Sequence, residues 1–332
     1  MDISLTHLKT LVAVVDAGGF GAAAAELGVS QSAVSHTIAA LERLSGQPVV
    51  TREFPITPTA LGQCILEHAR VAVAATTAAQ DVLRGRIGIP FGSITLAAPP
   101  TACHALLPDL LNAWEVELPR VRVVVLEGED AEVAAWLGDA TADAAVLVDP
   151  SEAPTRAVLL ARDTFCAAMR RDHPLAAEAV VDIADLTDDP LLLSTGGCEP
   201  HIRELHRRAR SEFRPTHRVR QLSTLFSMVR AGIGVTVVPE SAAGMEGDDL
   251  VLVPIKHNLQ RSLYLCGPSN RPWHPAVAHM VDTARSRTRP AQQPPSSTPL
   301  VKVGSTAGAN SGEWFAGSRS IGTVESIPPQ NR

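Results

Sequence analysis

Residues 23–46 read AAAELGVSQSAVSHTIAALERLSG, and this stretch predicts two short helices joined by a tight turn. Gly28 is expected to end the first helix, because a left-handed cap residue costs glycine the least. Ser30 is expected to begin the second helix as its N-cap, with its hydroxyl accepting from an unpaired backbone N–H. Apolar residues repeat at helical spacing in both segments: Ala23, Ala24 and Leu27 in the first, then Val34, Ile38 and Leu41 in the second.

The opposite face of the second predicted helix is polar. It carries Gln31, Ser32, Ser35, His36 and Arg43. Short polar groups near the start of such a helix are what the recognition of base edges in a DNA major groove requires. From this stretch alone, a solvated face on an ordinary helical hairpin stays open as the alternative.

The stretch also agrees with a known family pattern, without a gap from Phe20 to Gly46. The matching residues are Leu8, Leu11, Gly19, Phe20, Ala23, Ala24, Leu27, the run SQSAVS at 30–35, Ile38, Leu41, Glu42 and Gly46. The chain therefore resembles the LysR-type transcriptional regulators. The resemblance implies a winged helix-turn-helix DNA-binding domain over residues 1–62, with double-stranded promoter DNA as its partner. Its expected DNA contacts are Ser30, Gln31, Ser32, Ser35, His36, Arg43, Arg52, Thr57 and Thr59.

A two-stranded wing is expected after the second helix. Residues 48–50 predict one short strand and residues 56–57 predict the other. Arg52, Thr59 and Gly62 match the family pattern in this region.

The same module carries little positive charge. Its three basic residues stand against five acidic ones: Lys9, Arg43 and Arg52 against Asp2, Asp16, Glu26, Glu42 and Glu53. Because contacts to phosphates dominate DNA affinity, one subunit alone is expected to bind weakly. Helix N-termini and hydroxyls can hold phosphates without formal charge, and association of subunits is expected to supply the rest.

A long uninterrupted helix is predicted over residues 59–85. Its apolar and small residues repeat at alternating spacings of four and three: Ile65, Ala69, Ala72, Thr76, Ala79 and Leu83. Periodicity alone also allows a helix that packs only on its own domain. The family resemblance implies instead a linker helix that pairs subunits into a homodimer or homotetramer. Residues 85–92, with Pro90, are expected to form the hinge that follows.

The composition bounds the remaining function classes. The chain has 332 residues, of which 45% are hydrophobic, and a net charge of −6, so it has room for two or three domains. It has no apolar run of membrane-spanning length and no charged leader before an apolar core, so no membrane partner is expected. Five cysteines are scattered without Cys-x-x-Cys spacing, which favours a reduced, cytoplasmic location over disulfides or zinc: Cys64, Cys103, Cys166, Cys198 and Cys266.

Catalytic motifs are absent from the sequence. It contains no Gly-x-Gly-x-x-Gly, no P-loop, no His-Glu-x-x-His and no Gly-x-Ser-x-Gly pattern. We therefore expect a protein that is not an enzyme and that needs no cofactor or metal.

The region from about 93 to 287 alternates short apolar runs with helical patterns, which predicts a doubly wound α/β fold. Predicted strands lie at 94–98, 121–126, 144–148, 164–169, 191–193, 219–222 and 235–238. Predicted helices lie at 101–117, 129–138, 200–210 and 223–231.

Two phrases in this region resemble the effector domain of the same family. They are Asp-His-Pro-Leu at 172–175 and Val-Arg-Ala-Gly-Ile-Gly-Val at 229–235. The resemblance implies a periplasmic-binding-protein-like domain of two lobes over residues 92–287. Lobe I is expected at about 92–162 and 266–287, and lobe II at about 163–265. Residues 288–332 are rich in Pro, Ser, Gly and Thr, and a disordered tail is expected there.

An effector site is expected where strand and helix ends meet. In α/β lobes, ligands bind beyond the carboxyl ends of strands and near helix N-termini. The hydroxyls and backbone N–H groups at three such ends form a neutral cradle suited to a small anion. The expected effector-binding residues are Thr101, Asp149, Ser194, Thr195, Gly196, Gly197, Ser223, Thr224 and Phe226. Simple capping of helices by the hydroxyl residues remains open for each one taken singly.

Two alternatives to effector-controlled DNA binding stay open. Cys198 precedes a predicted helix, a setting that lowers the pKa of a thiol, and its position resembles the reactive cysteine of peroxide-sensing members of the family. Those members carry a second cysteine near the position of Arg207, so an intramolecular disulfide is not available here. The other alternative is a solute-binding protein without DNA binding, whose lobes look alike.

Overall fold

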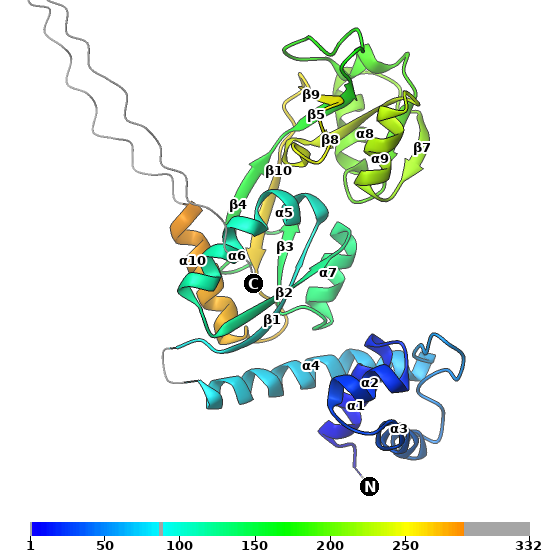
Figure 1. Cartoon of the computed structure of the whole chain (residues 1–332), viewed down its shortest axis with the longest axis vertical. Helices are drawn as coiled ribbons and strands as arrows, with labels where there is room; N and C mark the ends of the chain where they lie inside the picture. The colour runs from blue at the N-terminus through cyan, green and yellow to red at the C-terminus, as the bar shows by residue number, and fades with distance from the viewer. Residues whose placement is uncertain (1, 86–88, 289–332) are drawn as a thin grey trace, which may run out of the picture. The chain divides into compact units, whose positions relative to one another are not determined.

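The N-terminal part of the chain is a bundle of short helices. The computed structural model describes residues 2–85 and 89–288. Helices α1 (Leu5–Asp16), α2 (Phe20–Leu27) and α3 (Gln31–Ser45) pack on one another (Figure 1). Their shared core includes Leu11, Ala23, Val34, Ile38 and Leu41, which are the apolar positions that define the helix-turn-helix pattern.

The turn between α2 and α3 forms as its sequence predicts. Gly28 adopts a left-handed conformation with φ of 66°, which ends α2. The hydroxyl of Ser30 accepts a hydrogen bond from the backbone N–H of Ala33 at 3.2 Å, which begins α3. The N-cap and C-cap predictions are therefore confirmed.

The wing is less regular than the sequence suggested. In place of two strands, the segment forms one isolated antiparallel bridge between Val50 and Pro58. Pro55 and Pro58 have no N–H to donate to a ladder, so a regular two-stranded ribbon cannot continue there. The prediction of strands at 48–50 and 56–57 is wrong.

The long helix α4 (Ala60–Arg84) follows as predicted, with Thr59 as its N-cap. It packs against α1, and Arg70 pairs with Asp16. Near its C-terminal end two large apolar residues are exposed, Val82 at 58% and Leu83 at 85%. The hinge expected at 85–92 is described only in part, because residues 86–88 lie outside the described residues.

The remainder of the described chain forms two mixed α/β lobes, as the family resemblance implied. The lobe I sheet has the order β2-β1-β3-β10-β4 and the lobe II sheet has the order β7-β6-β8-β5-β9. The lobe I elements are β1 (Gly92–Ala98), α5 (Pro100–Ala105), α6 (Leu107–Glu117), β2 (Val121–Glu127), α7 (Asp130–Gly138), β3 (Ala144–Val148), β4 (Val158–Asp163), β10 (Arg261–Cys266) and α10 (Pro275–Thr288).

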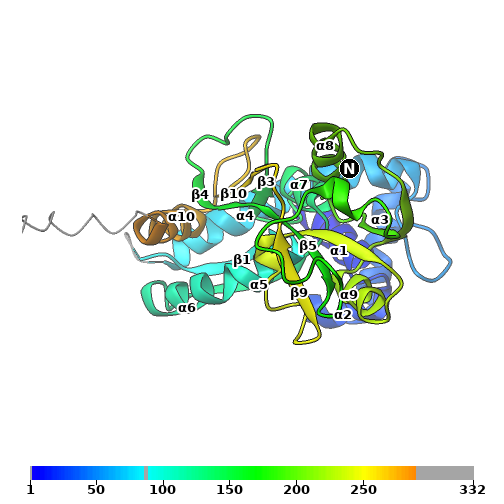
Figure 2. The same cartoon turned by 90° about the horizontal axis from the view of Figure 1, so that it is seen from above.

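Lobe II lies between β4 and β10 in the chain. Its elements are β5 (Phe165–Arg170), η1 (Ile183–Leu186), β6 (Leu191–Ser194), α8 (Glu199–Ala209), β7 (Pro215–Val219), α9 (Leu222–Arg230), β8 (Val235–Pro239), η2 (Glu240–Ala242) and β9 (Leu250–Pro254). Strands β4 and β10 run side by side and antiparallel, and they carry the chain between the lobes (Figures 1 and 2).

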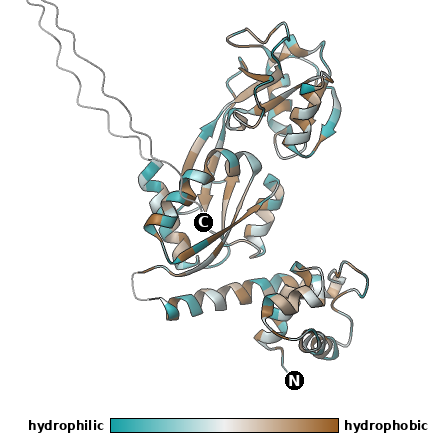
Figure 3. Cartoon of the chain, in the orientation of Figure 1, coloured by the Kyte–Doolittle hydropathy of each residue, from teal (hydrophilic) through white to brown (hydrophobic). Residues whose placement is uncertain are grey.

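Apolar strands supply the core of each lobe. Figure 3 shows hydrophobic residues concentrated on the strands inside lobe I. Trp114 on α6 is 1% exposed and its indole N–H donates to the backbone carbonyl of Met280 on α10 at 3.0 Å. This bond satisfies the one polar atom of a large buried side chain, so it fixes α6 against α10.

Two element predictions in the lobes need correction. The single helix expected at 101–117 is two helices, α5 and α6, because a helix cannot continue through Pro108 without losing a hydrogen bond and clashing with the preceding turn. The strand expected at 219–222 is β7, which ends at Val219. Its sequence PTHRV lacks apolar alternation because β7 lies at the edge of its sheet. Helix α10 also extends to Thr288, the first residue of the expected tail, and residues 289–332 lie outside the described residues.

Gly62 provides a stability test of the contact between α4 and the wing. A Cβ atom on Gly62 would lie 1.8 Å from the carbonyl oxygen of Val49, which is backbone and cannot turn aside. We expect Gly62→Ala to lower the free energy of unfolding by about 1–3 kcal/mol.

The matched control is Gly21→Ala on the exposed side of α2. The added methyl group meets only one atom, at 3.9 Å, and alanine favours a helix, so stability should hold or rise. Thermal unfolding followed by circular dichroism compares the two variants. Equal melting temperatures for both would contradict the close packing at Gly62.

Candidate functional site

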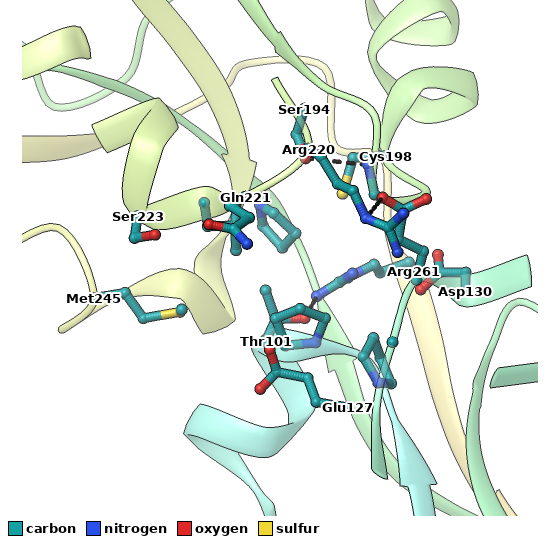
Figure 4. Close-up of a pocket in the computed structure, with 17 residues that line it drawn as sticks. Thr101, Glu127, Asp130, Ser194, Cys198, Arg220, Gln221, Ser223, Met245 and Arg261 are labelled. Carbon is teal, nitrogen blue, oxygen red and sulfur yellow. Dashed lines mark hydrogen bonds and ion pairs between the residues drawn. The ribbon is translucent and has the colours of Figure 1, made fainter. Parts of the chain in front are cut away.

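A cavity of about 510 Å³ lies between the two lobes. Its walls come from the residues that follow β1 and β2, the loop after β6, the start of α9 and the first residue of β10 (Figure 4). Thr101 and Glu127 belong to lobe I, and Ser194 and Ser223 belong to lobe II. A molecule in this cavity would therefore contact both lobes.

Four of the nine residues expected at an effector site line the cavity, namely Thr101, Ser194, Gly196 and Ser223. The other five do not. Phe226 is 0% exposed within the apolar core under α9, because an aromatic side chain on the inner face of an amphipathic helix is buried there. Thr195 and Thr224 are exposed elsewhere on the surface.

Asp149 and Gly197 lie where the two lobes contact each other near the cavity, but neither residue lines it. The Asp149 carboxylate lies 2.7 Å from Nε2 of His201 on α8 and accepts from the N–H of Ser262 at 2.6 Å. A Cβ atom on Gly197 would lie 2.1 Å from the carboxylate of Asp130, so only glycine allows lobe I to approach this closely.

A buried polar network forms the floor of the cavity. Arg261 donates through Nη2 to Asp163 at 2.8 Å, to Thr101 at 2.8 Å and to Ser241 at 2.9 Å. Ser241 in turn donates to Asp163 at 2.5 Å. Arg261 begins β10 and Asp163 ends β4, so the network joins the two crossing strands to α5 and η2.

Sequence reasoning missed this network and the acidic wall beside it. The residues missed are Glu127, Glu129, Asp130, Arg220, Met245, Asp163, Ser241 and Arg261. Arg261 and Asp163 stand 98 positions apart, and no local spacing connects them.

Asp130 is the most perturbed carboxyl group of the cavity wall. Burial raises its pKa to about 6, and the positive charge of Arg261 and the proximity of His201 oppose that rise. Its Oδ1 atom is buried without a hydrogen-bond partner among the described residues. The wall thus contains an acceptor with unused capacity.

Arg220 connects the lobes at the rim. It follows β7 in lobe II and contacts two carboxylates near the start of α7 in lobe I. Its Nε lies 3.0 Å from Glu129, and its Nη2 lies 2.7 Å from Glu132. Because Arg220 is 63% exposed, these pairs contribute little stability in water. They do define which lobe surfaces meet.

Cys198 lines the cavity, but its thiol differs from the expectation. The residue is 7% exposed, and burial raises its pKa to about 11. The expected lowering by the N-terminus of α8 is therefore wrong, because removal from water outweighs the helix dipole.

The expected DNA contacts divide into two groups. Gln31, Ser32, Ser35, His36 and Arg43 are exposed on α3. The others already make internal contacts: Ser30 caps α3, Thr59 caps α4 and donates to the Pro48 carbonyl, Arg52 pairs with Glu42 at 2.5 Å, and Thr57 lies 3.2 Å from the Thr51 hydroxyl. The exposed face of α3 is thus the surface that is free to meet a ligand.

The described part of the chain contains no group of three or more His, Cys, Asp or Glu side chains arranged to hold a metal ion. None of the described helices is long and apolar enough to cross a membrane.

Both modules match family models. The LysR substrate binding domain matches residues 88–289, and the bacterial regulatory helix-turn-helix protein, lysR family, matches residues 5–63. The HTH-type transcriptional regulator YvbU of Bacillus subtilis is 27% identical over 289 residues, which cover 85% of this chain and 98% of that protein. The probable hydrogen peroxide-inducible genes activator of Mycobacterium avium is 32% identical over 251 residues, 73% of this chain and 80% of that protein.

A solved structure shares the fold. Full-length CbnR in complex with its target DNA has a TM-score of 0.62 at 24% identity, covering 86% of this chain and 99% of that chain. The helix-turn-helix module and the two-lobed domain together define a DNA-binding regulator with an effector-binding domain. The chain belongs to the LysR family of transcriptional regulators, which are not enzymes. A solute-binding protein without a DNA-binding module is thereby excluded.

The raised pKa of Asp130 gives a pH-dependent prediction. In the unfolded chain this carboxyl group loses its proton near its ordinary pKa of 3.8, whereas the folded chain retains the proton until about pH 6. Ionisation of Asp130 therefore costs stability as the pH rises from about 4 to 6. We expect Asp130→Asn to remove that cost and to melt several degrees higher than wild type at pH 7.5.

The same comparison at pH 4 checks the direction of the effect. Residue 130 is uncharged in both folded proteins at that pH, so the difference in melting temperature should be smaller than at pH 7.5. Asp188→Asn, which removes an exposed carboxylate in lobe II, serves as the control. A difference between wild type and Asp130→Asn that is the same at both pH values would contradict the assignment.

Proposed function

We propose that this chain regulates transcription by binding promoter DNA through α3, in response to a small molecule held between its two lobes. The observation that carries the proposal is the exposed polar face of α3, set on a buried stripe of Val34, Ile38 and Leu41. That stripe fixes the helix to α1 and α2, so its outer face presents Ser35 and His36 in a defined orientation. A rigid helix with short polar side chains suits the major groove.

Association of subunits is part of the proposal. The charge of the module is low, and Arg52 is already paired with Glu42, so one copy offers few cations to phosphates. Helix α4 exposes Val82 at 58% and Leu83 at 85%, which an isolated chain would leave in water. A homodimer or homotetramer formed along α4 would cover them and place two copies of α3 on one promoter.

The cleft is the proposed effector site. Its volume suits a metabolite, and it is lined by both lobes. Thr101 and Ser194 offer hydroxyl groups that favour a carboxylate, in keeping with an anionic effector. A ligand can shift the lobes only if it binds one arrangement more tightly than another. Couplings of this kind are typically about 1–3 kcal/mol.

A thiol-based peroxide response is not favoured. The Mycobacterium avium relative is named a probable hydrogen peroxide-inducible genes activator, and Cys198 lines the cleft of this chain. Its thiol is buried and holds its proton far above neutral pH, whereas a peroxide-reactive cysteine needs the thiolate.

The DNA proposal predicts a loss of specific binding for Ser35→Ala and for His36→Ala. Each removes a polar group from the exposed face of α3 and leaves the buried stripe intact, so we expect about a tenfold weaker affinity for cognate promoter DNA. Gel-shift titration of the full chain measures it, with oligomeric state checked by size-exclusion chromatography. His279→Ala, an exposed histidine on α10, is the matched control. Unchanged midpoints for both α3 variants would disprove the assignment of this face.

The effector proposal predicts that Thr101→Val abolishes the response of promoter output to effector. Valine keeps the volume but removes the hydroxyl that lies in the cavity and accepts from Arg261. Thr101→Ser restores the hydroxyl and should restore the response. The measurement is the expression of a reporter gene under the cognate promoter, in cells grown with and without the conditions that induce that promoter. A full response from Thr101→Val would place the switch outside this cleft.

A further inference from the structure

The charges of the cleft are unequal on its two sides, and this bears on the kind of effector it accepts. Glu127, Glu129 and Asp130 line the lobe I side. Two arginines line the same cavity, Arg220 and Arg261. Each arginine is already matched within the protein: Arg261 by the buried Asp163, and Arg220 by Glu129 and Glu132. The cleft therefore has unused negative charge rather than unused positive charge.

Glu127 is the accessible member of the acidic side. It is the last residue of β2, pairs in register with Ala98 at the end of β1, and is exposed. Its carboxylate has no ion-pair partner in the part of the chain that the structure describes. Figure 4 shows it among the side chains that line the cavity. Asp130 lies on the same side, and its buried Oδ1 atom has no hydrogen-bond donor within residues 2–85 and 89–288. The carboxylates of Glu127 and Asp130 can both accept hydrogen bonds from a ligand, and a cationic donor would form the strongest of these bonds.

Two buried hydroxyl groups of the cavity wall can donate hydrogen bonds, whereas the carboxylates on the acidic side can only accept them. Thr101 is 4% exposed and its oxygen accepts from Arg261. Ser194 is 3% exposed and its oxygen accepts from the N–H of Gly196 at 3.3 Å. Each hydroxyl thus keeps its own proton, for which no acceptor exists among the described residues. Both residues line the cavity, so these protons can be donated to a ligand oxygen.

The acidic side chains and the two hydroxyl groups line the same cavity. Asp130 lies against Gly197, and Glu129 lies about one van der Waals contact from the position of a Cβ on Gly196, in the loop that follows Ser194. Pro100, Leu222, Pro239 and Met245 add an apolar surface to the wall, beside the polar side chains of Gln221 and Ser223. A ligand that fills the cavity therefore meets donors, acceptors and an apolar surface at close range.

We propose that the effector is a zwitterionic amino acid with an apolar side chain. Its carboxylate accepts from the hydroxyls of Thr101 and Ser194, its ammonium group donates to Glu127 and Asp130, and its side chain packs on Pro100, Leu222 and Met245. This inference rests on the proposed effector site and adds the cationic group to it. A carboxylate alone would leave the acidic side unpaired, and an amine alone would leave the hydroxyl protons unpaired.

The test uses matched sets of ligands on the full chain. Each set holds an amino acid, the same skeleton without the amine, and the same skeleton without the carboxylate. One set is L-leucine, 4-methylpentanoate and 3-methylbutylamine; another is L-phenylalanine, 3-phenylpropanoate and 2-phenylethylamine. The twenty common amino acids are first screened by thermal shift, and affinities are then measured by calorimetry. At least one apolar amino acid should bind, and each of its truncated partners should bind at least tenfold more weakly.

Glu127→Gln separates the ammonium contact from the rest of the site. It should weaken the amino acid about tenfold and leave the amine-free carboxylate within twofold of wild type. Glu115→Gln, an exposed glutamate on α6, is the control and should change neither.

Three results would overturn the inference: no amino acid binds, the amine-free carboxylate binds as tightly as its amino acid, or Glu127→Gln weakens both ligands equally. These failures are distinct from failure of the proposed function, because the Thr101→Val promoter assay uses the native effector. If Thr101→Val loses the promoter response but the wild-type chain binds no amino acid, the cleft remains the proposed effector site and a zwitterionic amino acid is excluded as its effector.

Discussion

Arg261 and Asp163 form an ion pair that is almost wholly removed from water, with side chains 2% and 5% exposed. Burying two charges is costly, and the cost is offset only when both are paired and hydrogen-bonded. Asp163 accepts from Arg261 and from Ser241, and Arg261 donates further to Thr101. Removing either charge would leave the other uncompensated, a loss of about 3–5 kcal/mol. The pair therefore constrains where β4, β10, α5 and η2 can lie.

The Arg261–Asp163 pair matters for function because it lies where the chain passes between the lobes. The only chain crossings between the lobes in the described part of the protein are β4 and β10, and the pair stands at one end of each. Thr101 belongs both to this network and to the cavity wall. A ligand that pulls on the Thr101 hydroxyl acts directly on the group that holds the crossing strands together. Arg220 with Glu129 and Glu132, and His201 with Asp149, join the same lobes at the rim.

The sequence predicts those features that local chemistry controls. The caps at Gly28 and Ser30, the stripe through Val34, Ile38 and Leu41, and the length of α4 all follow from residue type and spacing. The two-lobed fold came from the family resemblance together with the alternation of strands and helices. The site is predicted only in part. Hydroxyl groups at strand and helix ends indicate Thr101 and Ser194, whereas the prediction for Phe226 is wrong, because its burial depends on which face of α9 packs on the core. The acidic side and the Arg261 network depend on contacts between distant segments, and nothing in the local sequence indicates them.

We propose that the Arg261–Asp163 pair transmits the binding of an effector in the cleft to the DNA-binding module. Footprinting of the full chain on its promoter, with and without a low-molecular-weight extract of the host cells, tests it most directly when wild type is compared with Arg261→Lys. Lysine keeps the charge but has a single nitrogen, so it cannot replace both the Nε and the Nη2 donors that Arg261 directs at Asp163. We expect the extract to change the boundaries of the protected DNA for wild type and to leave those of a folded Arg261→Lys variant fixed. A variant whose footprint shifts as the wild-type footprint does would contradict this proposal.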